Sequence, residues 1–187
     1  MAGDAAKSDK SAFQIFRGAD ATPEDIGIMR SGPVTPVMAE GGRRMMEAGV
    51  EQGHETRLLF AGAGFSLTYV WFKSGYPLPR HSHDVDCLYY ILGGSLRLGT
   101  EELGTGDGFF VGGGVPYTYV PGPAGVEVLE FRAADAFDIK LLANNPAFWD
   151  KALQTVHANR ATWERQERPS QSARKERSSS TKASKRS

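Results

Sequence analysis

Apolar and polar residues alternate in short runs from about residue 55 onward, and glycines separate the runs. The longest run covers residues 65–73; its odd-numbered positions form a largely aromatic face, and its even-numbered positions turn apolar towards the end. Because successive side chains of a strand point to opposite faces, this run predicts a strand buried on both sides. Further strands are predicted at residues 56–60, 87–92, 95–98, 109–111, 117–120 and 126–131. Short strands at this spacing are typical of an all-β sandwich or barrel.

Glycine and proline groups mark the expected turns. Gly93-Gly94 predicts a hairpin turn between the strands at 87–92 and 95–98. Pro121-Gly122-Pro123 predicts a turn before the last strand. We therefore place the barrel within residues 55–132.

The flanking segments have a different pattern. Residues 1–12 are predicted to be disordered, and residues 13–54 to form an irregular arm with a single helical turn at Thr22-Pro23. After Arg132 the apolar period becomes helical, with Asn145 as N-cap and Pro146 at the first helical position. Residues 133–166 are thus predicted to be a helical extension that covers one open side of the barrel. Residues 167–187 are predicted to be a disordered basic tail that adds nothing to the core.

The composition narrows the class of protein. Basic and acidic residues number 22 each, so the formal net charge is zero and no overall field attracts nucleic acid or a membrane. The sequence has no apolar run near the ~20 residues of a membrane span, and its first residues lack the apolar core of a secretory signal. The single cysteine fits a reducing compartment. We expect a cytoplasmic protein that binds neither a membrane nor nucleic acid.

His81-Ser82-His83 is the clearest candidate for chemistry. Residues i and i+2 of a strand point to the same face about 7 Å apart, so the two imidazoles can converge on one point. Neutral imidazole is the commonest metal ligand, and two of them supply half of a four-coordinate site. The alternative is a pair of hydrogen-bonded polar histidines at the end of a strand.

Two stretches around these histidines resemble the two sequence motifs of the cupin superfamily. Gly75, His81, His83, Cys87 and Gly94 match the first motif, and residues 106–117 are similar to the second. The resemblance covers roughly residues 55–132. It implies an all-β, cupin-like double-stranded β-barrel, or jelly roll, with an N-terminal arm and a C-terminal α-helix.

The resemblance also implies a metal site, which in the family gathers three histidines and a glutamate. Carried over by position, His81 and His83 are metal ligands, Cys87 replaces the glutamate and Tyr117 replaces the third histidine. A Cys87 thiolate would suit zinc or copper. The resemblance as a whole implies a divalent metal cofactor (Zn, Fe, Cu, Mn or Ni). Alternatively, Cys87 is a small buried hydrophobe, and Tyr117 fills the barrel mouth with its hydroxyl bonded to a histidine.

Two functions follow from this resemblance. The first is a small-molecule metal-dependent enzyme of the dioxygenase, lyase or isomerase type, in which the catalytic residue Tyr117 acts on the substrate as hydrogen-bond donor or as acid or base. The second is a non-catalytic barrel with a degenerate metal site that binds an aromatic or carbohydrate-like molecule. Tyr89, Ile91 and Tyr117 are expected to line the pocket in both cases. The outward-facing apolar residues Leu88, Tyr90 and Leu92 predict a homodimer.

Overall fold

The computed structural model describes residues 13–21 and 27–172, so the expectations for residues 1–12, for the turn at Thr22-Pro23 and for residues 173–187 lie outside the described residues. The strands are β1 (Met29–Ser31), β2 (His54–Gly62), β3 (Phe65–Phe72), β4 (His81–Ser82), β5 (Cys87–Leu98), β6 (Glu101–Gly104), β7 (Gly108–Val111), β8 (Val120–Arg132) and β9 (Phe137–Leu141). The helices are α1 (Pro36–Glu47), the short 3-10 helix η1 (Val50–Gly53) and α2 (Pro146–Trp163).

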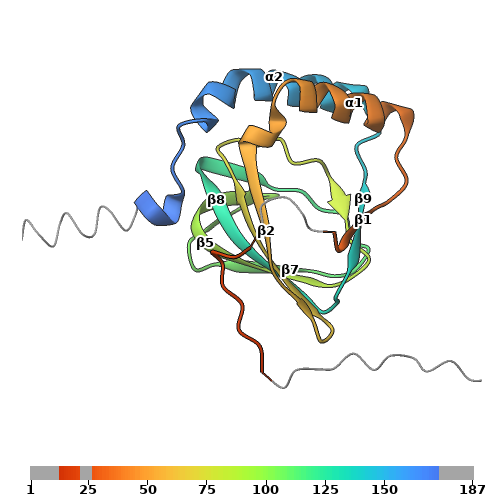
Figure 1. The fold of residues 1–187 in the computed structure, drawn as a ribbon. Helices are drawn as coiled ribbons and strands as arrows, with labels where there is room; N and C mark the ends of the chain where they lie inside the picture. The colour runs from red at the N-terminus through yellow and green to blue at the C-terminus, as the bar shows by residue number, and fades with distance from the viewer. Residues whose placement is uncertain (1–12, 22–26, 173–187) are drawn as a thin grey trace, which may run out of the picture.

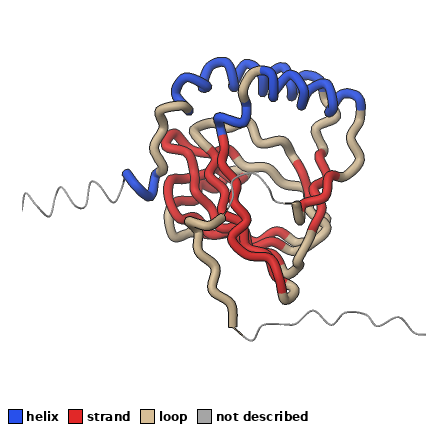
Figure 2. The backbone as a smooth tube through the Cα atoms, viewed as in Figure 1, coloured by secondary structure: helices blue, strands red, loops and turns tan. Residues whose placement is uncertain are grey.

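The strands form two sheets around a common interior (Figure 1; Figure 2). The larger sheet has the order β2-β3-β8-β5-β6, with β7 also paired to β5, and the smaller sheet has the order β1-β9-β4. A backbone bridge between His81 and Tyr117 ties the smaller sheet to the chain that leads into β8. The inner faces hold an apolar core, as in the double-stranded barrel that the two motifs predict. The cupin-like, all-β fold is therefore confirmed.

β5 is one continuous strand, and the predicted hairpin at Gly93-Gly94 is wrong. β5 pairs with β8 along most of its length, with register shifts near this glycine pair. Gly94 has a φ of 77°, and a Cβ on it would lie 2.0 Å from the carbonyl oxygen of Gly125. The two glycines thus let β5 bulge against β8 rather than reverse direction. The chain reverses between β5 and β6, at Gly99-Thr100.

β8 likewise runs through Pro121-Gly122-Pro123, where a turn was predicted. Its first residues pair with the end of β5, with Pro121 opposite Leu96. Proline cannot donate to a ladder, so it is tolerated near the start of a strand. β9 also departs from the prediction, because it lies in a segment predicted to be helical and pairs with both β1 and β4.

α1 corrects the prediction that residues 13–54 form an irregular arm. Thr35 caps the helix, since its hydroxyl oxygen accepts a hydrogen bond from the backbone nitrogen of Met38 at 3.3 Å. Gly41 and its neighbouring glycine disfavour an isolated helix, which hid α1 in the sequence pattern. A Cβ on Gly41 would lie 2.1 Å from the ring of Trp149, so this glycine lets α2 pack closely against α1.

α1 and α2 lie side by side across one end of the barrel (Figure 1). α2 begins as predicted, because the Asn145 side chain accepts a hydrogen bond from the Ala147 nitrogen at 3.0 Å. Trp163, fully buried at the other end of α2, donates from Nε1 to the carbonyl of Ser74 at 2.9 Å. The helices thereby close the barrel end, as expected for the C-terminal extension. No helix among the described residues is long and apolar enough to cross a membrane.

The first residues of the predicted tail dock on the barrel, which corrects the expectation that they add nothing to it. Arg168 donates from Nη2 to both carboxylate oxygens of Glu55, at 2.7 and 2.6 Å. Ser170 donates from its backbone nitrogen and its hydroxyl to the carboxylate of Glu127, at 2.7 and 2.9 Å. Glu127 is only 2% exposed, so its charge depends on these donors and on the Tyr69 hydroxyl.

The outer face of the larger sheet carries exposed apolar side chains. Leu88 is 52% and Phe110 is 63% exposed, and the two residues pair directly across β5 and β7. Phe131 is paired with Leu88 on the other side and stacks on Phe65 at 5.4 Å between ring centroids. This continuous patch is the surface that a second copy would cover, and the homodimer stays a prediction.

Candidate functional site

A cavity of about 110 Å³ lies inside the barrel between the two sheets. Its walls are largely apolar and include Val70, Phe72, Leu78, Phe137 and Ile139. Its polar end is formed by Thr68, His81, His83, Tyr117, Glu130 and Arg132. Two wider hollows, of about 530 and 300 Å³, lie outside the barrel against α2, and neither is lined by a histidine or cysteine of the described residues. Of these three hollows, the interior cavity is the one lined by His81, His83 and Tyr117.

His81 and His83 come together at this cavity, as their spacing predicts. Their ring centroids are 5.2 Å apart. The Nδ1 of His81 donates to the carbonyl of Pro79 at 2.8 Å, and the Nδ1 of His83 donates to the carbonyl of Asp138. Because a carbonyl oxygen can only accept, these contacts fix the tautomer and leave each Nε2 as the acceptor nitrogen of a neutral ring.

Burial keeps both imidazoles neutral. It lowers the pKa of His81, although the bond to the Pro79 carbonyl opposes the effect. Burial, together with the nearby positive charge of Arg132, lowers the pKa of His83 to about 4. At neutral pH the pair therefore offers two acceptors rather than two cations.

Tyr117 packs beside the histidines and is backed by a second tyrosine. Its ring centroid lies 4.4 Å from that of His81, and its hydroxyl is hydrogen-bonded to the hydroxyl of Tyr89. Tyr89 in turn stacks on Phe109 with centroids 4.4 Å apart. Burial and the negative charge of Glu130 raise the pKa of Tyr117 well above its usual range. Tyr117 is thus a protonated phenol at neutral pH, not a phenolate.

Cys87, Tyr89 and Ile91 face inward on β5 but belong to the packed core. They are 1%, 1% and 0% exposed. The cavity lining, as far as the described residues define it, includes none of the three. Burial raises the pKa of the Cys87 thiol to about 12, so forming a thiolate there is costly. Of the predicted pocket residues, only Tyr117 reaches the cavity directly, and Tyr89 supports it from behind.

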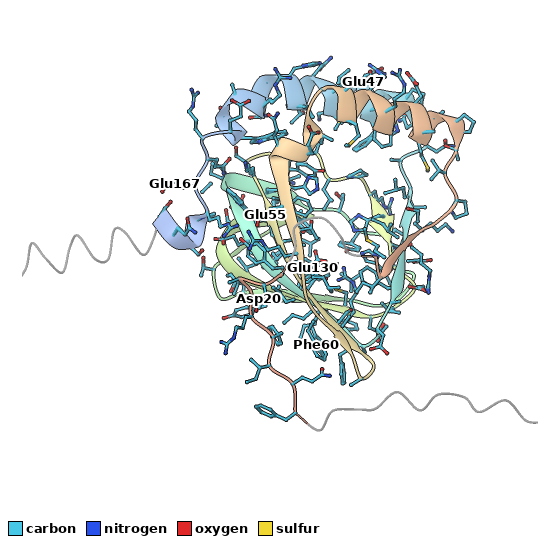
Figure 3. The ribbon with its side chains drawn as sticks, in the orientation of Figure 1. Asp20, Glu47, Glu55, Phe60, Glu130 and Glu167 are labelled. Atoms are coloured by element: carbon cyan, nitrogen blue, oxygen red, sulfur yellow. The ribbon has the colours of Figure 1, made fainter. Side chains whose placement is uncertain are left out.

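The structure adds Thr68, Glu130 and Arg132, which the sequence analysis did not single out. Arg132 is 2% and Glu130 is 9% exposed, and they form an ion pair of 2.6 Å inside the barrel. Figure 3 shows Glu130 amid the side chains of the barrel interior. The signal was present in the alternation of β8, since Val126 and Val128 are buried and residues 130 and 132 share their face.

The donor set does not fit the resident metal that the family resemblance implies. His81 and His83 would be the ligands, but no group of three His, Cys, Asp or Glu among the described residues is arranged to hold a metal ion. Cys87 is buried as a neutral thiol, and Tyr117 is a protonated phenol.

Fold and site together define a cupin-like barrel whose interior cavity has an apolar wall and a polar end. Three solved structures are similar to it. The polyketide cyclase RemF from Streptomyces resistomycificus has a TM-score of 0.47 and 23% identity, covering 57% of this chain and 82% of that chain. An RmlC-like cupin from Shewanella frigidimarina has a TM-score of 0.44 and 20% identity, and the match covers 67% of this chain and 92% of that chain. An oxalate decarboxylase variant from Bacillus subtilis has a TM-score of 0.40 and 18% identity, and the match covers 44% of this chain and 26% of the decarboxylase chain.

The double-stranded β-barrel that the two motifs imply is confirmed by the two sheets of the structure itself. No protein-family model matches the sequence, and no curated protein matches it. At these identities the likeness concerns the fold, and the activity of this chain has to be argued from its own residues.

Proposed function

We propose that this protein binds a small organic molecule in the barrel cavity, with the polar groups of that molecule turned towards His81, His83 and Arg132. The observation that carries this proposal is the combination of an apolar wall with a polar end whose hydrogen-bonding groups are partly unpaired. Within the described residues, the Thr68 hydroxyl and two nitrogens of Arg132 are buried without a partner. Pockets that bind small molecules typically combine such walls with a few polar groups that fix orientation.

Filling the cavity is expected to abolish this binding. Ile139 is a half-buried residue of the lining, so Ile139→Trp should block the cavity without disrupting the core. Ligand-detected NMR on a set of small aromatic and aliphatic molecules, with a metal chelator present, measures the effect. The matched control is Val120→Trp, which adds the same ring at an exposed position of β8. If Ile139→Trp binds the same molecules as wild type, the ligand does not occupy this cavity and the proposal fails.

A metal-dependent enzyme is the second candidate, favoured by one observation. The two Nε2 atoms are acceptor nitrogens on neighbouring rings, which is the state in which imidazole ligates a metal. In that case Tyr117 would serve as a hydrogen-bond donor or acid to the bound molecule. The proposed function does not depend on this metal.

Metal uptake separates the two candidates. Because the ligand set is incomplete, we expect wild-type protein under reducing conditions to hold less than roughly a tenth of an equivalent of any first-row divalent metal. Elemental analysis after dialysis measures this value. A full equivalent that is lost in His81→Ala and His83→Ala would favour the enzyme instead. Cys87→Ser should leave uptake unchanged, since Cys87 lies outside the cavity lining.

A further inference from the structure

The polar end of the cavity contains a buried ion pair on β8. The Nη2 of Arg132 donates to Oε2 of Glu130 at 2.6 Å, and the guanidinium carbon lies 4.0 Å from the ring centroid of Phe137. A buried ion pair requires good geometry and additional hydrogen bonds to offset its desolvation. Because the two side chains carry opposite unit charges, the pair adds no net charge to the cavity.

The guanidinium has donors left over. Nε and Nη1 of Arg132 are buried and have no acceptor in the described part of the chain. The Thr68 hydroxyl, which faces Glu130 across the β3–β8 ladder, is also buried without a partner there. Leaving a buried donor unpaired is unfavourable, and more so for a charged group. Arg132 and Thr68 both belong to the cavity lining, so an oxygen acceptor on a ligand would satisfy these donors once the two side chains turn them towards the cavity.

His81 and His83 present the opposite requirement. Each Nδ1 donates to a backbone carbonyl, so the remaining ring nitrogen can accept a hydrogen bond from a ligand. Phe137 connects the two regions, because His83 meets its ring edge-on at 5.3 Å while Arg132 covers the same ring. One small molecule can therefore reach an imidazole acceptor and the guanidinium donors at the same time.

We infer that the ligand is a small neutral molecule that carries both a hydroxyl and a carbonyl group. Its carbonyl oxygen accepts from Arg132, and its hydroxyl donates to His81 or His83. This inference rests on the proposed function, because it names the class of molecule that the cavity binds. A carboxylate is disfavoured by charge, because Glu130 already pairs with Arg132 and the described cavity lining holds no other lysine or arginine to balance an anion.

Four matched aromatic probes test these contacts on the full chain at neutral pH. The compound meta-hydroxybenzamide has both groups, meta-methoxybenzamide lacks the hydroxyl donor, phenol lacks the carbonyl, and meta-hydroxybenzoate carries the negative charge. We expect NMR titration to show that meta-hydroxybenzamide binds about tenfold more tightly than each of the others, the ratio expected from one hydrogen bond to a charged or buried group.

The outcomes distinguish this inference from the proposed function. Equal binding of all four probes, or tightest binding of meta-hydroxybenzoate, would overturn the neutral hydroxy-carbonyl ligand and leave cavity binding intact. Binding of none would overturn both. Because this comparison uses only the wild-type protein, it does not depend on whether any variant folds.

Variants locate the contacts. Arg132→Lys keeps the charge opposite Glu130 but removes the extra guanidinium donors. It should therefore weaken the binding of meta-hydroxybenzamide about tenfold and change the binding of phenol little. Thr68→Val should weaken the binding of the two amides, meta-hydroxybenzamide and meta-methoxybenzamide, roughly threefold. The matched controls are Arg97→Lys and Thr100→Val, which lie at exposed positions of β5 and its turn. An unchanged preference for meta-hydroxybenzamide over phenol in a folded Arg132→Lys protein would show that Arg132 does not contact the carbonyl.

Discussion

Truncation after Gln166 is expected to destabilise the protein by about 3 kcal/mol, which lowers the melting temperature of a domain of this size by roughly 6–12 °C. The truncation removes the Arg168–Glu55 ion pair and both hydrogen bonds from Ser170 to Glu127. Of its described partners, Glu127 would then keep only the Tyr69 hydroxyl. Thermal unfolding followed by circular dichroism measures the change.

A second truncation controls for chain length. Removing only residues 173–187 keeps Arg168 and Ser170, so this protein should melt within about a degree of the full chain. If both truncated proteins melt at the same temperature, the docked residues contribute nothing and the original expectation of an uninvolved tail holds after all. Ser170→Ala should give an intermediate value, since it deletes the hydroxyl bond and keeps the backbone bond to Glu127.

Acid is expected to destabilise the barrel through His83. Its pKa is lowered from 6.5 to about 4 by burial and by Arg132, so the unfolded chain takes up the proton first as the pH falls. The stability associated with the neutral ring is fully present above pH 6.5, is lost between pH 6.5 and pH 4, and changes no further below that. A shift of this size corresponds to at most about 3 kcal/mol. Denaturant unfolding of chelator-treated protein across this range measures it.

His83→Asn isolates the contribution of this one group. The asparagine amide can still donate to the Asp138 carbonyl but does not titrate in this range. Contributions of the carboxylates are shared by both proteins and cancel in the difference. The wild-type stability should therefore fall more steeply between pH 6.5 and pH 4 than that of the variant. Parallel curves would mean that His83 is not held neutral by the fold.

The strands and the barrel class were predictable because period-two alternation survives in most of the sheet. Local turn chemistry was misleading at Gly93-Gly94, since a strand bulge uses the same glycine conformation as a hairpin turn. α1 was hidden for a different reason. Gly41 lowers the intrinsic helix propensity, and the partner that requires a glycine there, Trp149, is more than a hundred residues away.

The candidate site was predictable only along a single strand. The spacing of His81 and His83 places both rings at the cavity, but it cannot show whether Cys87 lies within reach of them. Arg132 and Glu130 come from another strand, and a charged residue near a strand end is more often solvated than buried. Their role becomes visible only when β3 and β8 are paired, which places Thr68 opposite Glu130.

Cys87 gives the barrel an intrinsic reporter of its own opening. It is the only cysteine of the chain, it is 1% exposed, and its thiol has a pKa raised to about 12. A maleimide or disulfide reagent therefore finds neither access nor thiolate while the barrel is closed. When closing is faster than labelling, the rate of modification measures the equilibrium population of the opened barrel. A molecule seated in the cavity should slow this reaction in proportion to its occupancy, so the affinity of an unlabelled ligand can be read from the chemistry of one sulfur atom.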